Sequence, residues 1–252
     1  MWTGFGVFRR NARRAPHRAT VYTMLEELKE RVYRAHLALV ERGLLFQTWG
    51  NASGCDRERG WVVIKPSGVP YDRLGPDCMV LVDGHGDLVE GTLNPSVDAP
   101  THIALYNAFP DIGGVVHTHS HYATCFAQAR RPIPCLGTTH ADYFHGSVPV
   151  AEPLSARDVE RDYERCIGES IAGLFARRSP AECPAALAAN HGPFAWGATV
   201  EQAVEHAVVL EEVARMAFHT LALAPDAVPI DGFLLDKHFL RKHGRGAYYG
   251  QP

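Results

Sequence analysis

The chain has 252 residues, of which 46% are hydrophobic and 21% are charged, and its formal net charge is −3. These values are typical of a globular protein with one large domain, and they give no general basis for binding nucleic acid or a membrane. The six cysteines form no Cys-x-x-Cys pair, so we expect a soluble cytoplasmic protein with reduced thiols.

The first 23 residues are rich in arginine, and no acidic residue precedes Glu26. Transit peptides can have a similar composition. We interpret residues 1–23 as a basic extension that is either disordered or the product of a mis-assigned start codon, because an amphipathic pattern begins at Met24. The predicted domain therefore comprises residues 24–252.

Helices and short strands alternate along this domain. Apolar residues at three- and four-residue spacing predict helices, and short apolar runs bounded by glycine or proline predict strands. The helices are expected over residues 24–42, 100–109, 155–175, 199–223 and 231–243, and strands over 61–65 and 79–83. This alternation predicts a layered α/β domain.

Three histidines are candidate metal ligands. His117 and His119 follow a Gly-Gly-Val-Val run that reads as a buried strand, so both imidazoles are predicted to project from one face. His191 stands in an Asn-His-Gly-Pro turn, and three histidines with an open fourth position are typical of a catalytic zinc site. Asp98 could add a carboxylate, although a plain helix cap is the alternative. Each histidine could also be an ordinary core or turn residue.

Small turns at the ends of predicted strands are candidate anion sites. Their residues are Gly50, Asn51, Ser67, Gly68 and Ser96. Backbone N–H groups and short hydroxyls in such turns can bind a phosphate, and Lys65 adds a cation. The alternative is that glycine and serine simply form turns.

Asp142 lies in an aromatic stretch, where desolvation would raise its pKa toward the range useful for proton transfer. A capping or salt-bridged aspartate is the alternative. The aromatic tail at Tyr248 and Tyr249 needs a surface on which to pack, so we expect it to bind a neighbouring subunit or cover a site.

Six motifs together resemble the L-ribulose-5-phosphate 4-epimerases, a family of the class II aldolase/adducin-head superfamily. They are Thr48–Ser53, Ile64–Val69, His117–Ser120, Gly137–Asp142, His191–Gly197 and Leu240–Gln251. The resemblance runs from Met24 to Gln251 almost without gaps. It implies one three-layer α/β/α domain around a mixed, largely antiparallel sheet, in a homotetramer with active sites at subunit interfaces.

The resemblance also implies roles for single residues. His117, His119 and His191 would bind zinc, or another divalent metal such as manganese or cobalt, with Asp98 counted beside them. Gly50, Asn51, Ser67, Gly68 and Ser96 would bind the substrate and its phosphate, and to these we add Lys65 as the cation beside them. Asp142 and Tyr249 match an acid–base pair, with Tyr249 supplied by a neighbouring subunit. Val97 departs from the pattern, which has a second serine there, so we expect weaker phosphate binding or a slightly different ketose.

The implied reaction converts L-ribulose 5-phosphate into D-xylulose 5-phosphate in pentose catabolism of the L-arabinose type. C4 of this ketose is β to the carbonyl, so its hydrogen is barely acidic, and no nicotinamide-binding Gly-x-Gly-x-x-Gly follows a predicted strand. The remaining mechanism is metal-assisted cleavage and re-formation of the C3–C4 bond. Two alternatives stay open: a class II aldolase resembling L-fuculose-phosphate aldolase, and a non-catalytic adducin-head-like assembly module.

Overall fold

The computed structural model describes residues 18–249, with side chains from Leu25 onward. Its helices are α1 (Arg18–Glu41), α2 (Ala99–Ala108), α3 (His121–Gln128), α4 (Thr138–Ala141), α5 (Ala156–Leu174), α6 (Val200–Leu223) and α7 (Gly232–His243). Its strands are β1 (Asn51–Asp56), β2 (Trp61–Ile64), β3 (Val80–Asp83), β4 (Leu88–Glu90), β5 (Gly114–His117), β6 (Ala185–Ala188) and β7 (Gly192–Gly197). None of these helices is long and apolar enough to cross a membrane. Residues 1–17, most of the expected basic extension, lie outside the described range.

The strands form one sheet in the order β4-β3-β2-β1-β5-β7-β6. All six pairings between them are antiparallel. The parallel component that we expected is reduced, within residues 18–249, to an isolated bridge between Val150 and Leu187. The largely antiparallel sheet is therefore confirmed.

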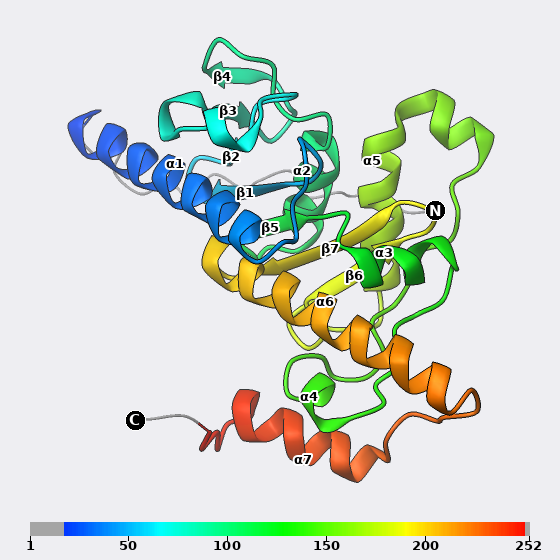
Figure 1. The fold of residues 1–252 in the computed structure, drawn as a ribbon. Helices are drawn as coiled ribbons and strands as arrows, with labels where there is room; N and C mark the ends of the chain where they lie inside the picture. The colour runs from blue at the N-terminus through cyan, green and yellow to red at the C-terminus, as the bar shows by residue number, and fades with distance from the viewer. Residues whose placement is uncertain (1–17, 250–252) are drawn as a thin grey trace.

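Helices cover both faces of the sheet (Figure 1). α1, α3 and α6 pack on one face, while α2 and α5 pack against each other on the other. Two neighbouring residues of β1 show the division. A Cβ on Gly54 would lie 2.7 Å from Leu28 of α1, whereas the next side chain, Ser53, bonds to His102 and Tyr106 of α2. The predicted three-layer α/β/α domain is confirmed.

Two element boundaries differ from the expected ones. α1 begins at Arg18 instead of Met24, since neither glycine nor proline interrupts residues 18–23. β5 ends at His117, so His119 lies in the segment before α3 and not on the strand. The expected pairing of these two histidines on one strand face is therefore wrong, although the turn still directs both rings to the same place.

Candidate active site

The register of three central strands places the first residues of the site. Asn51 of β1, His117 of β5 and Phe194 of β7 are directly paired and form one row across the sheet. Side chains of directly paired residues point to the same face. Because Ser53 of β1 faces α2 and lies two residues from Asn51, this row also faces α2, at the point where β5 ends.

The structure brings the three predicted metal ligands together. His191 lies in the turn between β6 and β7, next to the end of β5. One candidate ligand atom from each of His117, His119 and His191 lies within 4.8 Å of the others. The Nε2 atoms of His117 and His119 are 3.1 Å apart, and the ring centroid of His117 is 4.8 Å from that of His191.

The protonation of this cluster fits a divalent metal. Nδ1 of His117 donates to the carbonyl oxygen of Pro193 at 3.0 Å, which leaves Nε2 as the free ligand atom. Burial lowers the pKa of His117 to about 3, and burial also lowers the pKa of His119 and of His191. All three imidazoles are thus neutral near neutral pH, the form that binds Zn²⁺ and similar ions.

Two glycines let the backbone approach the ligand-bearing segment. Gly50 has a φ of +78°, and a Cβ there would lie 2.7 Å from the carbonyl oxygen of His117. A Cβ on Gly192 would lie 2.7 Å from the carbonyl oxygen of Thr118. The turn before β1 and the start of β7 are therefore held against the residues between His117 and His119.

Asp98 occupies the position before α2, but its side chain makes no capping hydrogen bond. Its Oδ2 instead accepts a hydrogen bond of 2.6 Å from Asn51 Nδ2, which also donates to Ser96 Oγ at 3.0 Å. Burial opposes ionisation of Asp98, but the electrostatic effects of His117 and His102 and the bond from Asn51 outweigh it, so the pKa of Asp98 is lowered. The carboxylate is an anion beside the histidine cluster, outside the group of three imidazoles.

The expected phosphate-binding residues lie on two segments that run side by side. The amide of Ser67 donates to the carbonyl of Asn94, and the amide of Ser96 to the carbonyl of Lys65, each at 2.9 Å. Ser96 is buried, whereas Ser67 and Gly68 are exposed, and 63% of Val97 is exposed. Short hydroxyl and amide groups therefore gather at the surface next to Asn51 and Asp98.

Lys65 lies beneath these segments and is only 2% exposed. Its Nζ donates to the carbonyl of Pro66 at 3.1 Å and lies 5.2 Å from the ring centroid of Tyr71. Burial lowers the pKa of Lys65. The hydroxyl of Tyr71 in turn bonds to the carbonyl of Gly50 at 2.8 Å, so the buried cation and the Gly50 turn are packed together.

Asp142 belongs to a second cluster, on α4 and α7. Its carboxylate accepts hydrogen bonds from Arg241 Nη2 at 2.7 Å, Arg241 Nε at 3.1 Å and His238 Nδ1 at 3.0 Å. Burial acts to raise the pKa of Asp142, but the bonds from Arg241 and His238 outweigh it and lower the pKa. The expectation of a raised pKa is therefore wrong, and the salt-bridged alternative holds.

Tyr249 lies at the edge of this second cluster and is 61% exposed. The Arg241 guanidinium and the Lys242 ammonium lie 5.0 and 4.5 Å from its ring centroid. Within residues 18–249, this cluster shares no hydrogen bond, ion pair or ring contact with the histidine cluster. A single chain thus presents two separate groups of candidate site residues.

Comparison with known proteins relates these clusters to a family. The model of the Class II Aldolase and Adducin N-terminal domain matches residues 30–218. The chain belongs to this family. It is similar to L-ribulose-5-phosphate 4-epimerase UlaF of Salmonella paratyphi A and of Salmonella typhi, each 51% identical over 227 residues, which is 90% of this chain and 100% of each relative.

Solved structures of class II aldolases share the fold. An L-fuculose 1-phosphate aldolase is 26% identical with a TM-score of 0.72, covering 84% of this chain and 94% of the other. YgbL from Klebsiella pneumoniae, described as a putative aldolase/epimerase/decarboxylase, is 27% identical with a TM-score of 0.69, covering 84% and 98%.

Two residues beside the histidine cluster and Asp98 escaped the sequence analysis. His102 lies on α2, four residues after Asp98, a spacing that could have revealed it as a neighbour on the same helix face. Tyr163 of α5 stacks on His191 with a centroid distance of 6.1 Å and an interplanar angle of 11°, and its hydroxyl is 3.4 Å from His191 Nδ1. Nothing in the local sequence around Tyr163 indicates this contact.

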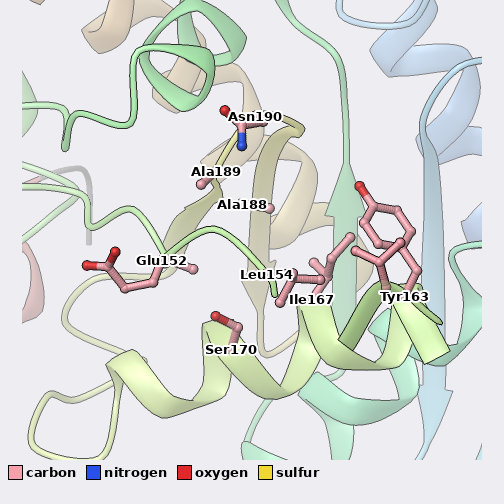
Figure 2. A pocket seen from close by; sticks show the side chains of 10 residues that line it. Glu152, Leu154, Tyr163, Ile167, Ser170, Ala188, Ala189 and Asn190 are labelled. Atoms are coloured by element: carbon pink, nitrogen blue, oxygen red, sulfur yellow. The ribbon is translucent and has the colours of Figure 1, made fainter. Parts of the chain in front are cut away.

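A cavity of about 130 Å³ adjoins the histidine cluster, between α5 and the end of β6. Figure 2 shows Tyr163 and Asn190, a ring partner and a chain neighbour of His191, among the residues that line it. Its other walls include Leu154, Ile167 and Ala188. Glu152 and Ser170 also line it, but no lysine, arginine or histidine does, so it does not resemble a binding site for the phosphate of a sugar.

Proposed function

We propose that this chain is a metal-dependent epimerase that interconverts L-ribulose 5-phosphate and D-xylulose 5-phosphate by cleaving and re-forming the C3–C4 bond. The relatives that are 51% identical over their full length carry this activity in their names. The observation that carries the chemistry is the cluster of three neutral imidazoles within 4.8 Å. We place the reaction in cytoplasmic pentose catabolism of the L-arabinose type.

His117, His119 and His191 would hold the metal, for which we propose Zn²⁺, because borderline ions favour neutral imidazole. When bound, the ion would supply Lewis-acid stabilisation of the charge left on the substrate's C2 and C3 oxygens as the C3–C4 bond opens. Asp98, kept ionised by its partners, would add negative charge next to these three histidines where the metal binds. Asn51 holds that carboxylate in place through its 2.6 Å bond.

The phosphate must remain anchored while the aldehyde fragment turns its other face to C3. We assign this task to Ser67, Gly68 and Ser96, with Lys65 beneath them as the nearby cation. Gly50 sets the turn that brings Asn51 to the same surface. Val97 stands where the epimerase pattern has a second serine after Ser96, and the loss of one hydrogen bond to a charged acceptor is worth roughly 1.5–3 kcal/mol.

Asp142 and Tyr249 would exchange protons with the C4 oxygen from opposite sides. Asp142 is ionised in its resting state and can accept a proton, but its lowered pKa makes it a weaker base than an unpaired carboxylate; the phenol of Tyr249 is the proton donor. Since these residues lie apart from the histidines of their own chain, we propose that they complete the site of a neighbouring subunit in a homotetramer.

Exposed apolar side chains support this assembly. Phe233 of α7 is 75% exposed and Tyr248 is 66% exposed, both on the part of the chain that carries Asp142 and Tyr249. Trp49 is 57% exposed, and its ring centroid lies 6.3 Å from that of His119. Both clusters thus have apolar surface beside them, which a subunit contact would bury.

The function is tested by assaying metal-dependent conversion of L-ribulose 5-phosphate to D-xylulose 5-phosphate. We expect the wild-type chain to bind close to one zinc per subunit and His119→Ala to lose both metal and turnover. His121→Ala, an exposed histidine two residues away, is the matched control and should keep both. Turnover that survives complete removal of divalent metal would contradict the proposal.

The shared site is tested by mixing two inactive variants. His119→Ala lacks the metal ligand and Tyr249→Phe lacks the phenol, so each alone should retain little activity. Random co-assembly should restore roughly one quarter of the sites, because each restored site takes its histidines from one variant and its tyrosine from the other. If mixed assemblies stay as inactive as the separate variants, Tyr249 does not act across an interface.

An aldolase that releases its fragments is the second candidate, because an L-fuculose 1-phosphate aldolase shares the fold. Trapping free glycolaldehyde phosphate with a coupled dehydrogenase separates the two reactions. An epimerase should release only traces of this fragment during many turnovers. A non-catalytic assembly role would require that the three histidines bind no metal.

A further inference from the structure

A chain of three buried polar side chains leads from the interior to the metal site. The hydroxyls of Tyr106 and Ser53 are 2.8 Å apart, and Ser53 Oγ is 2.7 Å from His102 Nδ1. All three residues are at most 1% exposed. The other ring nitrogen, His102 Nε2, is buried and has no hydrogen-bond partner among the described residues, although most buried polar atoms have one. The proposed function gives none of these residues a role.

The hydrogen bonds have one direction that leaves the fewest groups unpaired. Among the described residues, Ser53 Oγ is the one group within hydrogen-bond distance of the Tyr106 hydroxyl, so it is the acceptor on hand for the phenol proton. The phenol then donates to Ser53, and Ser53 donates to His102 Nδ1. The opposite direction would leave the Tyr106 proton without an acceptor as well as His102 Nε2 unpaired.

This direction fixes the tautomer of His102. With Nδ1 as acceptor, a neutral His102 carries its proton on Nε2, and burial does keep this ring neutral, with a pKa lowered to about 3. The unpaired group is therefore an N–H donor. A buried donor without an acceptor is costly, so this group requires an oxygen or a water beside it.

Asp98 is the candidate acceptor, because the carboxylate and the His102 ring are close enough for each to shift the pKa of the other. It lies one helical turn before His102, and the amide of His102 donates to the carbonyl of Asp98 at 3.1 Å. The ring of His102 meets Phe194 edge-on at 6.1 Å, and Phe194 stacks on His117 at 4.2 Å. His102 thus lies behind the row of residues that carries the metal ligand His117, on the side of Asp98.

We propose that His102 is a positioning residue whose Nε2–H donates to the Asp98 carboxylate through one buried water, with its tautomer set by Ser53 and Tyr106. Asp98 is then held by two donors, Asn51 and His102, and keeps one orientation toward the histidine cluster. Without the second donor the carboxylate can turn away, and the site loses negative charge where a cation binds.

Two substitutions of His102 separate the roles of its nitrogens. The amide of His102→Asn reaches the place of Nδ1 and keeps an acceptor for Ser53, but it has no group at the place of Nε2. The amide of His102→Gln can place an N–H where Nε2 stood. We expect zinc affinity, measured without substrate by competition with a chromophoric chelator, to fall about 10–100-fold in His102→Asn and much less in His102→Gln.

Controls separate this effect from a loss of packing. His140 is another buried histidine with an unpaired ring nitrogen, outside the histidine cluster, and His140→Asn should leave zinc affinity unchanged. Wild-type affinity in His102→Asn, or equal losses in both His102 variants, would overturn the proposal. If His102→Asn fails to fold, Ser53→Ala and Tyr106→Phe replace it: each should weaken zinc binding several-fold, and unchanged affinity in both would overturn the proposal.

The role of His102 rests on the proposed function only through the metal site. Because zinc affinity is measured without substrate, a chain that binds zinc but converts no L-ribulose 5-phosphate would refute the proposed function and leave the role of His102 standing. In a working epimerase, His102→Asn should lower kcat more than it changes KM, since Asp98 acts at the metal and not on the phosphate.

Discussion

Gly50 joins the turn before β1 to the segment that carries the candidate metal ligands His117 and His119. Its φ of +78° disfavours any side chain, and a Cβ there would also meet the carbonyl of His117 at 2.7 Å and Leu45 at 2.6 Å. A substitution must therefore strain the turn and displace the segment between His117 and His119. Gly68 has a similar φ of +68°, but a Cβ there would have no neighbour within 4 Å.

We expect Gly50→Ala to cost about 3 kcal/mol or more of the free energy of unfolding, from strain and collision together. Gly68→Ala, the matched control, should cost only about 1–2 kcal/mol, because it adds strain alone. Urea denaturation of the metal-free proteins measures both values. Equal costs would show that the contact with the His117 carbonyl relaxes without penalty.

At the scale of single residues, the three histidines of the cluster could be predicted from the sequence. The ion pairing of Asp142, and hence the direction of its pKa shift, could not. The histidines at positions 117, 119 and 191 are potential metal ligands, and the short sequences around them already indicate this. The partners of Asp142 lie on α7, far away in the sequence, and only folding brings Arg241 and His238 to its carboxylate. A local aromatic pattern therefore gave the wrong direction for its pKa.

At the scale of elements, the five longest helices followed from their periodicity, whereas the short helices α3 and α4 and the central strand β1 did not. β1 reads Asn-Ala-Ser-Gly-Cys-Asp and has no apolar alternation, yet it lies between β2 and β5 with its first four residues buried. Its small residues suit close contact with helices on both faces. A strand of this kind is defined by its neighbours, so its own sequence does not reveal it.

α5 contains a break that its sequence also conceals. Asp162 has non-helical angles, φ −174° and ψ 84°, and its Oδ1 accepts a hydrogen bond from the amide of Arg165 at 3.3 Å, as at the start of a helix. Tyr163 therefore begins a new helical segment, and this change of direction accompanies its stacking on His191. Neither proline nor glycine marks the place.

At the scale of the whole molecule, buried neutral histidines connect separate layers. His36 of α1 donates from Nδ1 to the carbonyl of Val32 at 2.7 Å, and its Nε2 accepts the amide of Ala52 in β1 at 2.9 Å. Burial lowers the pKa of His36 to about 3 and that of His140 to about 4. Both rings must stay neutral to remain buried in the folded chain.

This predicts that acid weakens the fold before the carboxylates titrate. The unfolded chain takes up protons on these histidines near pH 6.5, whereas the folded chain does so only near pH 3 to 4. The contribution is fully present above about pH 6.5 and is lost as the pH falls, at about 1.4 kcal/mol per pH unit for each such histidine.

Denaturation of the metal-free protein between about pH 7.5 and about pH 5 measures this slope. His140→Asn removes one of the two groups, so its unfolding free energy should depend less steeply on pH by about one proton. Parallel curves for wild type and variant would mean that His140 has the same proton affinity in the folded and unfolded chains.

The turn that carries His191 joins the last two strands of the sheet, whereas His117 ends the central strand β5 and His119 follows it. A bound ion would therefore cross-link the His191 turn to the segment of His117 and His119. Such a link would reduce the number of conformations available to the denatured chain. In cells short of the metal, the protein would then be less stable as well as inactive. Proteases would degrade it faster.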